Sequence, residues 1–134
     1  MNEKTLFVRD YMTAEPICIS TDMDILQAIS RLLQHEISGA PVIDEQGKLS
    51  GILTERDCIK VAVHAGYFDD FGGKVSNYMT RQVETVSPDD HLMDIAEKFI
   101  SSPFRRYPVI DKGDIIGLIT RRDVLKALKA VAYK

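Results

Sequence analysis

Two threonine–aspartate pairs are the residues of this chain whose types and spacing suit chemistry. Thr54 precedes Asp57 by three residues, and Thr120 precedes Asp123 by the same interval. At the start of a helix this spacing is typical of a capping box, in which each side chain satisfies a backbone N–H of the other residue. A carboxylate can also accept two hydrogen bonds from neighbouring ribose hydroxyls, and free N–H groups at a helix start suit phosphate. The pairs therefore indicate either structural caps or nucleoside-phosphate sites.

A glycine precedes each pair at the same distance. Gly51 stands three residues before Thr54, and Gly117 stands three residues before Thr120. Helix capping does not require these glycines, whereas a backbone that something approaches closely has no room for a side chain. The glycines therefore favour a ligand site in addition to the caps.

The two halves of the chain differ in their basic residues. The second half has Arg105-Arg106 where the first has Ser38-Gly39, and Arg121-Arg122 where the first has Glu55-Arg56. A guanidinium group is planar, multidentate and permanently charged, so it suits phosphate. Adjacent arginines on a solvated face would give the same pattern. We expect the better site for a phosphorylated ligand to combine Thr54 and Asp57 with Arg105 and Arg106.

No group of residues in the sequence suits an active site or a metal ion. An enzyme needs a nucleophile with a base, paired carboxylates in a cleft, or a metal. His35, His64 and His91 are widely separated, and none shows a metal-ligand spacing. Cys18 and Cys58 each have aliphatic neighbours, which is typical of small buried hydrophobes in a reducing compartment. We predict that the protein is not an enzyme and has no metal site.

A repeat with an offset of about 67 residues positions these side chains. Three blocks recur in order, residues 8–13 as 75–80, residues 41–44 as 108–111, and residues 51–57 as 117–123. Composition does not produce an ordered recurrence of this kind. We expect two copies of one unit, residues 1–70 and 71–134, that share a core because each copy alone would be marginal.

Each copy is expected to form a strand, a helix, two strands and a second helix. In the first copy the pattern predicts strands at 16–19, 40–44 and 49–53, and helices at 25–33 and 54–65. Gly66 would end the second helix, with Cys58, Ile59, Ala62 and Val63 on one face. In the second copy it predicts strands at 83–86, 107–111 and 115–119, and helices over 92–100 and 121–133. Ser87-Pro88 would start the first of these helices.

Composition limits the class and the partners of the protein. The hydrophobic content of 45% and charged content of 28% fit a globular domain. A net charge of -3 argues against a nucleic-acid partner, which would need many basic residues. No apolar run approaches the roughly 20 residues that span a bilayer, and residues 1–4 lack the apolar core of a signal peptide. We therefore expect a cytoplasmic protein without a membrane partner.

Residues 66–74 connect the two copies and contain three aromatic residues. Tyr67, Phe68 and Phe71 would suit a partner-binding patch or a cover over the edge of the core. Of these two roles we expect the cover.

The ordered set of repeated motifs resembles a known family. The leading Tyr-Met-Thr, the Pro-Val-Ile-Asp strand and the Gly-x-x-Thr-x-x-Asp segment, each present twice, are similar to a tandem pair of cystathionine-β-synthase (CBS) domains, often called a Bateman module. The resemblance covers about residues 6–132. It implies an α/β (α+β) fold of two β-α-β-β-α CBS repeats packed with pseudo-twofold symmetry. It also implies that the motif Asp holds ribose, that Thr lies near ribose or phosphate, and that the base enters between strands of the opposite repeat.

Carried over residue by residue, the resemblance implies two ligand sites. One combines Thr54 and Asp57 with Val83, Glu84, Thr85, Phe104, Arg105, Arg106, Tyr107 and Pro108. The other combines Thr120, Arg121 and Asp123 with Ile17, Cys18, Ile19, Ile37, Ser38, Gly39, Ala40 and Pro41.

The resemblance implies a regulatory function. We expect a stand-alone CBS pair that requires no cofactor, binds AMP, ADP or ATP as a regulatory ligand, and signals to an effector protein. S-adenosylmethionine and dinucleotides also contain adenosine and are further candidate ligands. The alternative is an interaction or scaffold protein with vestigial nucleotide pockets. The family often forms homodimers through helices, and Ile59, Val63, Leu125 and Leu128 would leave apolar surface for such contacts.

Overall fold

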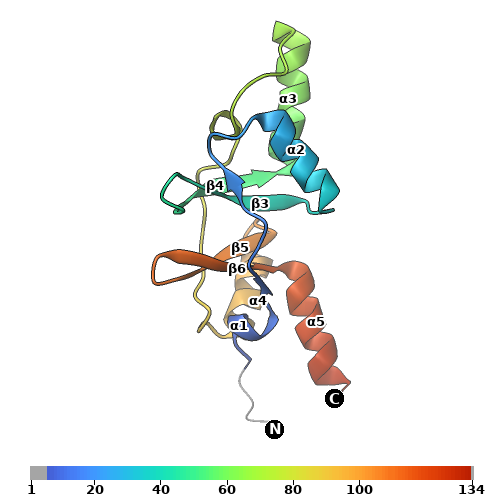
Figure 1. The fold of residues 1–134 in the computed structure, drawn as a ribbon. Coiled ribbons are helices and arrows are strands. Elements are labelled where there is room, and N and C mark those ends of the chain that lie inside the picture. Colours follow the sequence, from blue (N-terminus) through green and yellow to red (C-terminus); the bar gives the residue numbers. More distant parts are fainter. Residues whose placement is uncertain (1–5, 134) are drawn as a thin grey trace. The chain divides into compact units, whose positions relative to one another are not determined.

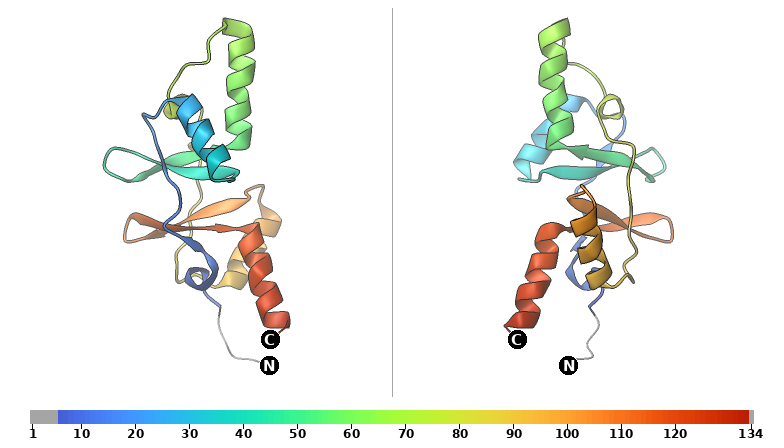
Figure 2. Two further views of the ribbon diagram at one scale, coloured as in Figure 1. Left: turned by 45° about the vertical axis from the view of Figure 1, so that its right-hand side comes forward. Right: turned by 180° about the vertical axis from the view of Figure 1, so that it is seen from behind.

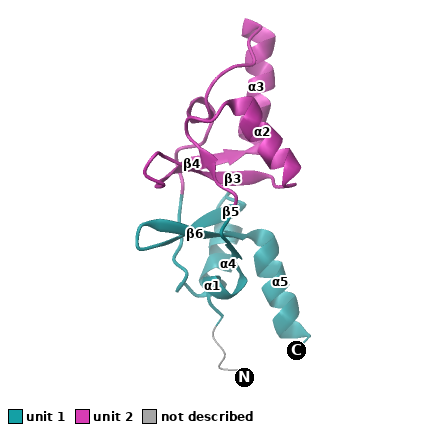
Figure 3. Cartoon of the chain, viewed as in Figure 1, with its two compact units in different colours: residues 1–16, 84–134 teal, residues 17–83 magenta. Residues whose placement is uncertain are grey.

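The computed structural model describes residues 6–133, which divide into two compact units (Figure 3). Unit 1 contains the described residues up to Pro16 and those from Glu84 onward, and unit 2 contains residues 17–83. The amino-terminal residues 1–4, which we predicted not to form a signal peptide, lie outside the described residues. Within the described part of the chain, no helix combines the length and the apolar character needed to cross a membrane.

Unit 2 is built on the three-stranded sheet β2–β3–β4. Its elements are β2 (Ile19–Ser20), α2 (Ile25–Gln34), β3 (Gly39–Ile43), β4 (Leu49–Thr54), α3 (Glu55–Phe68) and the 3-10 helix η1 (Val75–Asn77). β2 runs parallel to β3, and β3 runs antiparallel to β4. Helices α2 and α3 lie on the same side of the β3–β4 hairpin (Figures 1 and 2). Their buried side chains and those of the strands form one hydrophobic cluster.

Unit 1 is built on the antiparallel sheet β1–β6–β5. Its elements are α1 (Val8–Tyr11), β1 (Thr13–Ala14), α4 (Leu92–Ser101), β5 (Arg106–Asp111), β6 (Asp114–Thr120) and α5 (Arg121–Ala132). Helices α4 and α5 lie on the same side of the β5–β6 hairpin (Figure 1). This unit has its own hydrophobic cluster, which includes Ile95, Phe99, Tyr107 and Ile119.

Each unit includes a short segment that the sequence repeat assigns to the other copy. Val75 and Met79 belong to the hydrophobic cluster of unit 2, and Val8 belongs to that of unit 1. The backbones of Ile52 and Thr80 exchange two hydrogen bonds of 2.9 and 2.8 Å. The compact units therefore divide after residues 16 and 83, whereas the repeated sequence was divided at 70/71. A core shared by both copies stays a prediction.

Helix α3 ends later than the sequence predicted. Gly66 lies inside the helix, which continues to Phe68. The turn that ends it uses Asp69, which adopts the left-handed conformation (φ 53°, ψ 42°) and donates its N–H to the carbonyl of Ala65 (2.8 Å). Aspartate tolerates this conformation better than most residues. The expected stop at Gly66 was therefore wrong.

The buried face of α3 is not the face that carries Ile59 and Val63. Val61 and Ala65 are buried together with Asp57, while Ile59 and Val63 are exposed. Spacing of four residues along the helix places the buried three on one face. The apolar residues Ile59 and Val63 therefore lie outside the core of unit 2.

Three other local predictions were wrong or only partly right. The strand predicted at 16–19 is shorter than expected, since β2 begins only at Ile19. Pro16 has no N–H to donate to a strand ladder. Val86 forms only an isolated bridge with Val109. Ser87 does not cap α4, since its N–H donates to Asp90 Oδ2 (2.8 Å) in a turn and His91 is the N-cap.

The aromatic residues of the connector are exposed. Tyr67 is 82% exposed, Phe68 69% and Phe71 57%. They therefore do not cover the core of unit 2, contrary to our expectation.

Candidate functional site

Thr54 and Asp57 form a capping box where β4 meets α3. Thr54 Oγ1 accepts a hydrogen bond from the backbone N–H of Asp57 (3.2 Å), and Asp57 Oδ2 accepts one from the backbone N–H of Thr54 (3.0 Å). Thr54 Oγ1 also donates to Asp57 Oδ2 (3.0 Å). Asp57 is only 2% exposed. The cap is confirmed, and it holds the carboxylate in one orientation.

Thr120 and Asp123 repeat this geometry where β6 meets α5. The corresponding distances are 3.2 Å from Asp123 N to Thr120 Oγ1, 2.9 Å from Thr120 N to Asp123 Oδ2, and 3.0 Å between Thr120 Oγ1 and Asp123 Oδ2. Asp123 is 5% exposed. Each unit therefore fixes one buried carboxylate at the start of a helix.

Asp57 has two further partners that the sequence analysis did not identify. Thr80 Oγ1 lies 3.0 Å from Asp57 Oδ1 and 3.2 Å from Oδ2. Lys60 Nζ lies 3.2 Å from Oδ1. The repeat held a signal for both, because Thr80 ends the second Tyr-Met-Thr and Lys60 has a counterpart in Lys126.

The chain itself approaches the glycines that precede the two threonines. A Cβ atom on Gly51 would lie 2.6 Å from the carbonyl oxygen of Thr80 and 3.0 Å from Met79 Sδ. A Cβ atom on Gly117 would lie 2.5 Å from Met12 Sδ. The Met-Thr segments therefore make the close approach for which the sequence analysis invoked a ligand.

Strand pairing places one further predicted ligand residue beside each of the two motif threonines. Gly39 is the register partner of Thr54, and Arg106 is the register partner of Thr120. The carbonyl of Arg105 accepts a hydrogen bond from the backbone N–H of Arg121 (3.3 Å). Within one unit, the two arginines thus lie next to Thr120. Their predicted combination with Thr54 and Asp57 stays a prediction.

The predicted ligand residues are divided between the units. Unit 2 holds Ile17, Ile19, Ile37, Ser38, Gly39, Ala40, Pro41, Thr54, Asp57 and Val83. Unit 1 holds Thr85, Phe104, Arg105, Arg106, Tyr107, Pro108, Thr120, Arg121 and Asp123.

Several of these side chains have structural contacts. Ile19 and Ala40 belong to the hydrophobic cluster of unit 2. The Tyr107 ring packs on Phe99 with centroids 4.8 Å apart, and its hydroxyl lies 2.7 Å from Ser102 Oγ. These side chains therefore support the cores of their own units.

Arg121 ties the start of α5 to the loop before β5. Its Nη2 donates to the carbonyl of Phe104 (3.1 Å). The arginine is exposed at this position. It therefore stabilises the loop that carries Arg105 and Arg106.

Both cysteines are shifted towards the neutral thiol. Burial, together with the nearby carboxylates of Asp57 and Glu55, raises the pKa of Cys58 to about 11. Burial also raises the pKa of Cys18, against the opposing charge of Arg31. A protonated thiol is a weak nucleophile and a weak metal ligand. Among the described residues, no three His, Cys, Asp or Glu side chains are grouped as metal ligands would be.

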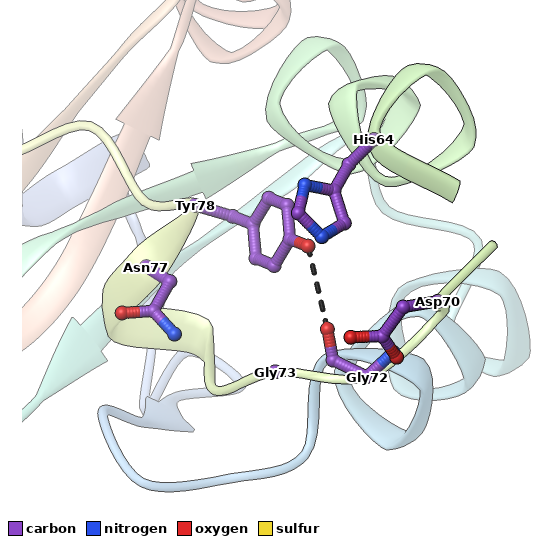
Figure 4. A pocket seen from close by; sticks show the side chains of 6 residues that line it. All are labelled: His64, Asp70, Gly72, Gly73, Asn77 and Tyr78. Atoms are coloured by element: carbon purple, nitrogen blue, oxygen red, sulfur yellow. Dashed lines mark hydrogen bonds between the residues drawn. The ribbon is translucent and has the colours of Figure 1, made fainter. Parts of the chain in front are cut away.

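A separate pocket of about 420 Å³ lies in unit 2, where the connector meets α3 (Figure 4). It is lined by His64, Asp70, Gly72, Gly73, Asn77 and Tyr78. The Tyr78 hydroxyl donates to the carbonyl of Gly72 (3.4 Å) and so holds the connector against η1. None of the predicted ligand residues lines this pocket.

Comparison with known families accounts for the repeat. A model of the CBS domain matches the chain twice, over residues 8–64 and 75–130. This chain belongs to the CBS domain family. The resemblance inferred from the repeated motifs is thereby confirmed, together with the mixed fold of two CBS repeats.

Curated relatives contain this CBS pair in proteins of different lengths. The uncharacterized protein MJ1225 of Methanocaldococcus jannaschii is 32% identical over 121 residues, which are 90% of this chain but 42% of that protein. The CBS domain-containing protein YhcV of Bacillus subtilis is 30% identical over 87% of this chain and 81% of that protein. For inosine-5'-monophosphate dehydrogenase of Aquifex aeolicus the match, at 35% identity, covers 88% of this chain but 24% of the dehydrogenase. The likeness to this enzyme is thus confined to about a quarter of its length.

Solved structures of CBS pairs share the fold. CBSX2 in complex with AMP has a TM-score of 0.83 at 26% identity, covering 94% of this chain and 98% of that one. CBSX2 has also been solved from Arabidopsis thaliana, with a TM-score of 0.86, 26% identity and coverage of 98% and 99%. The CBS pair of protein MJ0100, in complex with 5-methylthioadenosine and S-adenosyl-L-methionine, has a TM-score of 0.81 at 27% identity, covering 96% and 99%. Both of the ligand complexes contain an adenosine group.

Proposed function

We propose that this CBS pair is a regulatory module that binds an adenosine-containing ligand through Asp57 and Asp123 and passes its presence to an effector protein. The observation that carries the proposal is the buried carboxylate that a threonine fixes at a helix start in each unit. Related CBS pairs in complex with AMP, and with 5-methylthioadenosine and S-adenosyl-L-methionine, support this ligand class. The proposed role is regulatory and not catalytic.

Different predicted residues would contact the ribose, the phosphate and the base of the ligand. In this proposal the carboxylates accept hydrogen bonds from the vicinal ribose hydroxyls, and charge-assisted bonds of this kind are the stronger ones. Arg105 and Arg106 would contact the phosphate, since guanidinium groups bind phosphate oxygens in a multidentate way. The segments around Ile17 and Val83 would contact the base.

Calorimetric titration with AMP, ADP, ATP, S-adenosylmethionine and GMP tests the proposal. We expect saturable binding of at least one adenosine compound and much weaker binding of GMP. Thermal unfolding gives an independent readout, because a ligand at 100 times its Kd stabilises the native state by about 2.7 kcal/mol. Absence of binding by every adenosine compound would contradict the proposal.

Titration of an arginine variant with adenosine and with AMP tests the phosphate contact. Arg106→Ala should weaken AMP binding about 10- to 150-fold, the effect of losing a hydrogen bond to a charged group, and should leave adenosine binding almost unchanged. Arg122→Ala, at an exposed position outside the proposed site, is the matched control. An equal loss for AMP and adenosine in folded Arg106→Ala would show that this arginine does not contact phosphate.

An interaction module is the second candidate function, and exposed apolar residues favour it. Ile59, Leu125 and Leu128 lie on α3 and α5 with 63–65% of their surface exposed. Helices that present such residues suit contacts between copies of the same chain. A homodimer through these helices is compatible with either candidate function.

A further inference from the structure

The acceptor positions of Asp57 are fully used by the chain itself. A carboxylate offers about four lone-pair positions for hydrogen bonds. Asp57 accepts from the N–H and hydroxyl of Thr54, from the hydroxyl of Thr80 and from the ammonium group of Lys60. The Thr80 hydroxyl lies within 3.2 Å of both oxygens and so sits in the fork of the carboxylate. A vicinal diol needs that fork for its own two hydroxyls.

Asp123 has acceptor positions left over. Among the described residues, only Thr120 donates to its carboxylate, and both bonds end on Oδ2. The two lone pairs of Oδ1 match the two hydroxyls of a vicinal diol. The two carboxylates therefore differ in how readily they can accept a ribose.

The same residue types occupy equivalent positions in the sequence and strand register relative to both carboxylates. Thr13 pairs with Leu118 in the β1–β6 ladder, as Thr80 pairs with Ile52. Lys126 follows Asp123 by three residues, as Lys60 follows Asp57. In the hydrogen bonds of the described residues, however, neither Thr13 nor Lys126 reaches Asp123. The arrangement of two threonines, an aspartate and a lysine is therefore closed at Asp57, where all three neighbours donate to the carboxylate. It is open at Asp123, where, of the described residues, only Thr120 donates.

We propose that Thr80 and Lys60 form a displaceable latch on Asp57, so that ribose binds first at Asp123 and binds at Asp57 only by displacing the latch. This inference rests on the proposed function and concerns the regulation of the same site. Displacement has a structural consequence, because Thr80 follows Met79, a member of the hydrophobic cluster of unit 2. A ligand bound at Asp57 therefore shifts the segment of Met79 and Thr80, which packs into unit 2. A ligand bound at Asp123 does not shift this segment.

Adenosine titration of variants that keep a single carboxylate tests the latch. In Asp123→Asn protein, Thr80→Val should strengthen adenosine binding about tenfold, the lower end of what a hydrogen bond to a charged group contributes. In Asp57→Asn protein, the matched change Thr13→Val should leave adenosine binding unchanged. The gain should vanish with 2',3'-dideoxyadenosine, which lacks the diol.

A second pair of variants keeps the test decisive if Thr80→Val does not fold. Lys60 is 60% exposed in its side chain, so Lys60→Met should fold and should also strengthen adenosine binding at Asp57. Lys126→Met is its control at Asp123. Unchanged or weaker binding in the folded Thr80→Val and Lys60→Met variants would overturn the latch alone. Absence of adenosine binding in the wild type and every variant would overturn the proposed function as well.

Discussion

Asp57 shows how one residue can serve both as a cap and as a proposed ligand contact. Its Oδ2 is bound to Thr54 at the start of α3, so the side chain cannot rotate freely. A carboxylate held in this way loses little conformational entropy when a ligand binds. The capping box is therefore compatible with binding, and it supplies the orientation that binding needs.

Gly51 provides a residue-scale prediction about stability. Gly51→Ala should destabilise the protein by about 1–3 kcal/mol, because the new methyl group would overlap the carbonyl of Thr80 and the sulfur of Met79. Gly66→Ala is the control, since a Cβ atom there meets nothing within 4 Å and alanine favours the helix by about 0.5–1 kcal/mol. Urea unfolding of both variants measures the difference. A Gly51→Ala protein as stable as Gly66→Ala would contradict the packing explanation.

The sequence predicted the part of the site that is local. Thr54 and Asp57 are three residues apart, so their spacing alone indicated the capping box that the structure contains. The bond from Thr80 to Asp57 joins residues 23 positions apart and depends on how the segment around Met79 packs. No periodicity or spacing rule specifies such a contact, although the repeated Tyr-Met-Thr pointed to a common role.

At the scale of elements, the hairpins and the longer helices were predicted well and the element ends less well. The 3.6-residue periodicity of α2 and α4 reflects burial of one face, which a single sequence shows directly. The end of α3 depends instead on which residue adopts the left-handed conformation, and Asp69 rather than Gly66 does so. The apolar surface that we expected at Ile59 and Val63 is confirmed, since both side chains are exposed.

The segment around η1 leads to an element-scale prediction about folding. A fragment of residues 17–83 should be more stable than a fragment of residues 17–74, which lacks Val75 and Met79. Full burial of a side chain such as Val or Met contributes about 1.5–3 kcal/mol each, and the shorter fragment also loses the backbone bonds between Thr80 and Ile52. Circular dichroism during urea unfolding compares the two fragments. Equal unfolding midpoints would show that this segment does not stabilise unit 2.

At the scale of the whole molecule, the repeat and the compact units describe different divisions of one chain. The family matches follow the sequence, over residues 8–64 and 75–130, whereas each unit takes a leading segment from the other copy. This exchange explains why the 1–70 division suggested by the motifs does not enclose either compact unit. Thr80 belongs to the second CBS repeat by sequence and to unit 2 by packing. A ligand that displaces Thr80 would therefore link the second repeat to the core of unit 2.

Exposed apolar residues on α3 and α5 lead to the prediction that two copies associate in solution. Analytical ultracentrifugation should give a mass near twice that of the chain, because Ile59, Leu125 and Leu128 are surface residues whose burial between copies would stabilise a dimer. Leu128→Glu should shift the equilibrium towards the monomer, since a dimer contact would bury its charge. Lys129→Glu, at a neighbouring exposed position of α5, changes the charge without removing an apolar side chain and is the control. A monomer mass for the wild type that does not change with concentration would contradict association through these helices.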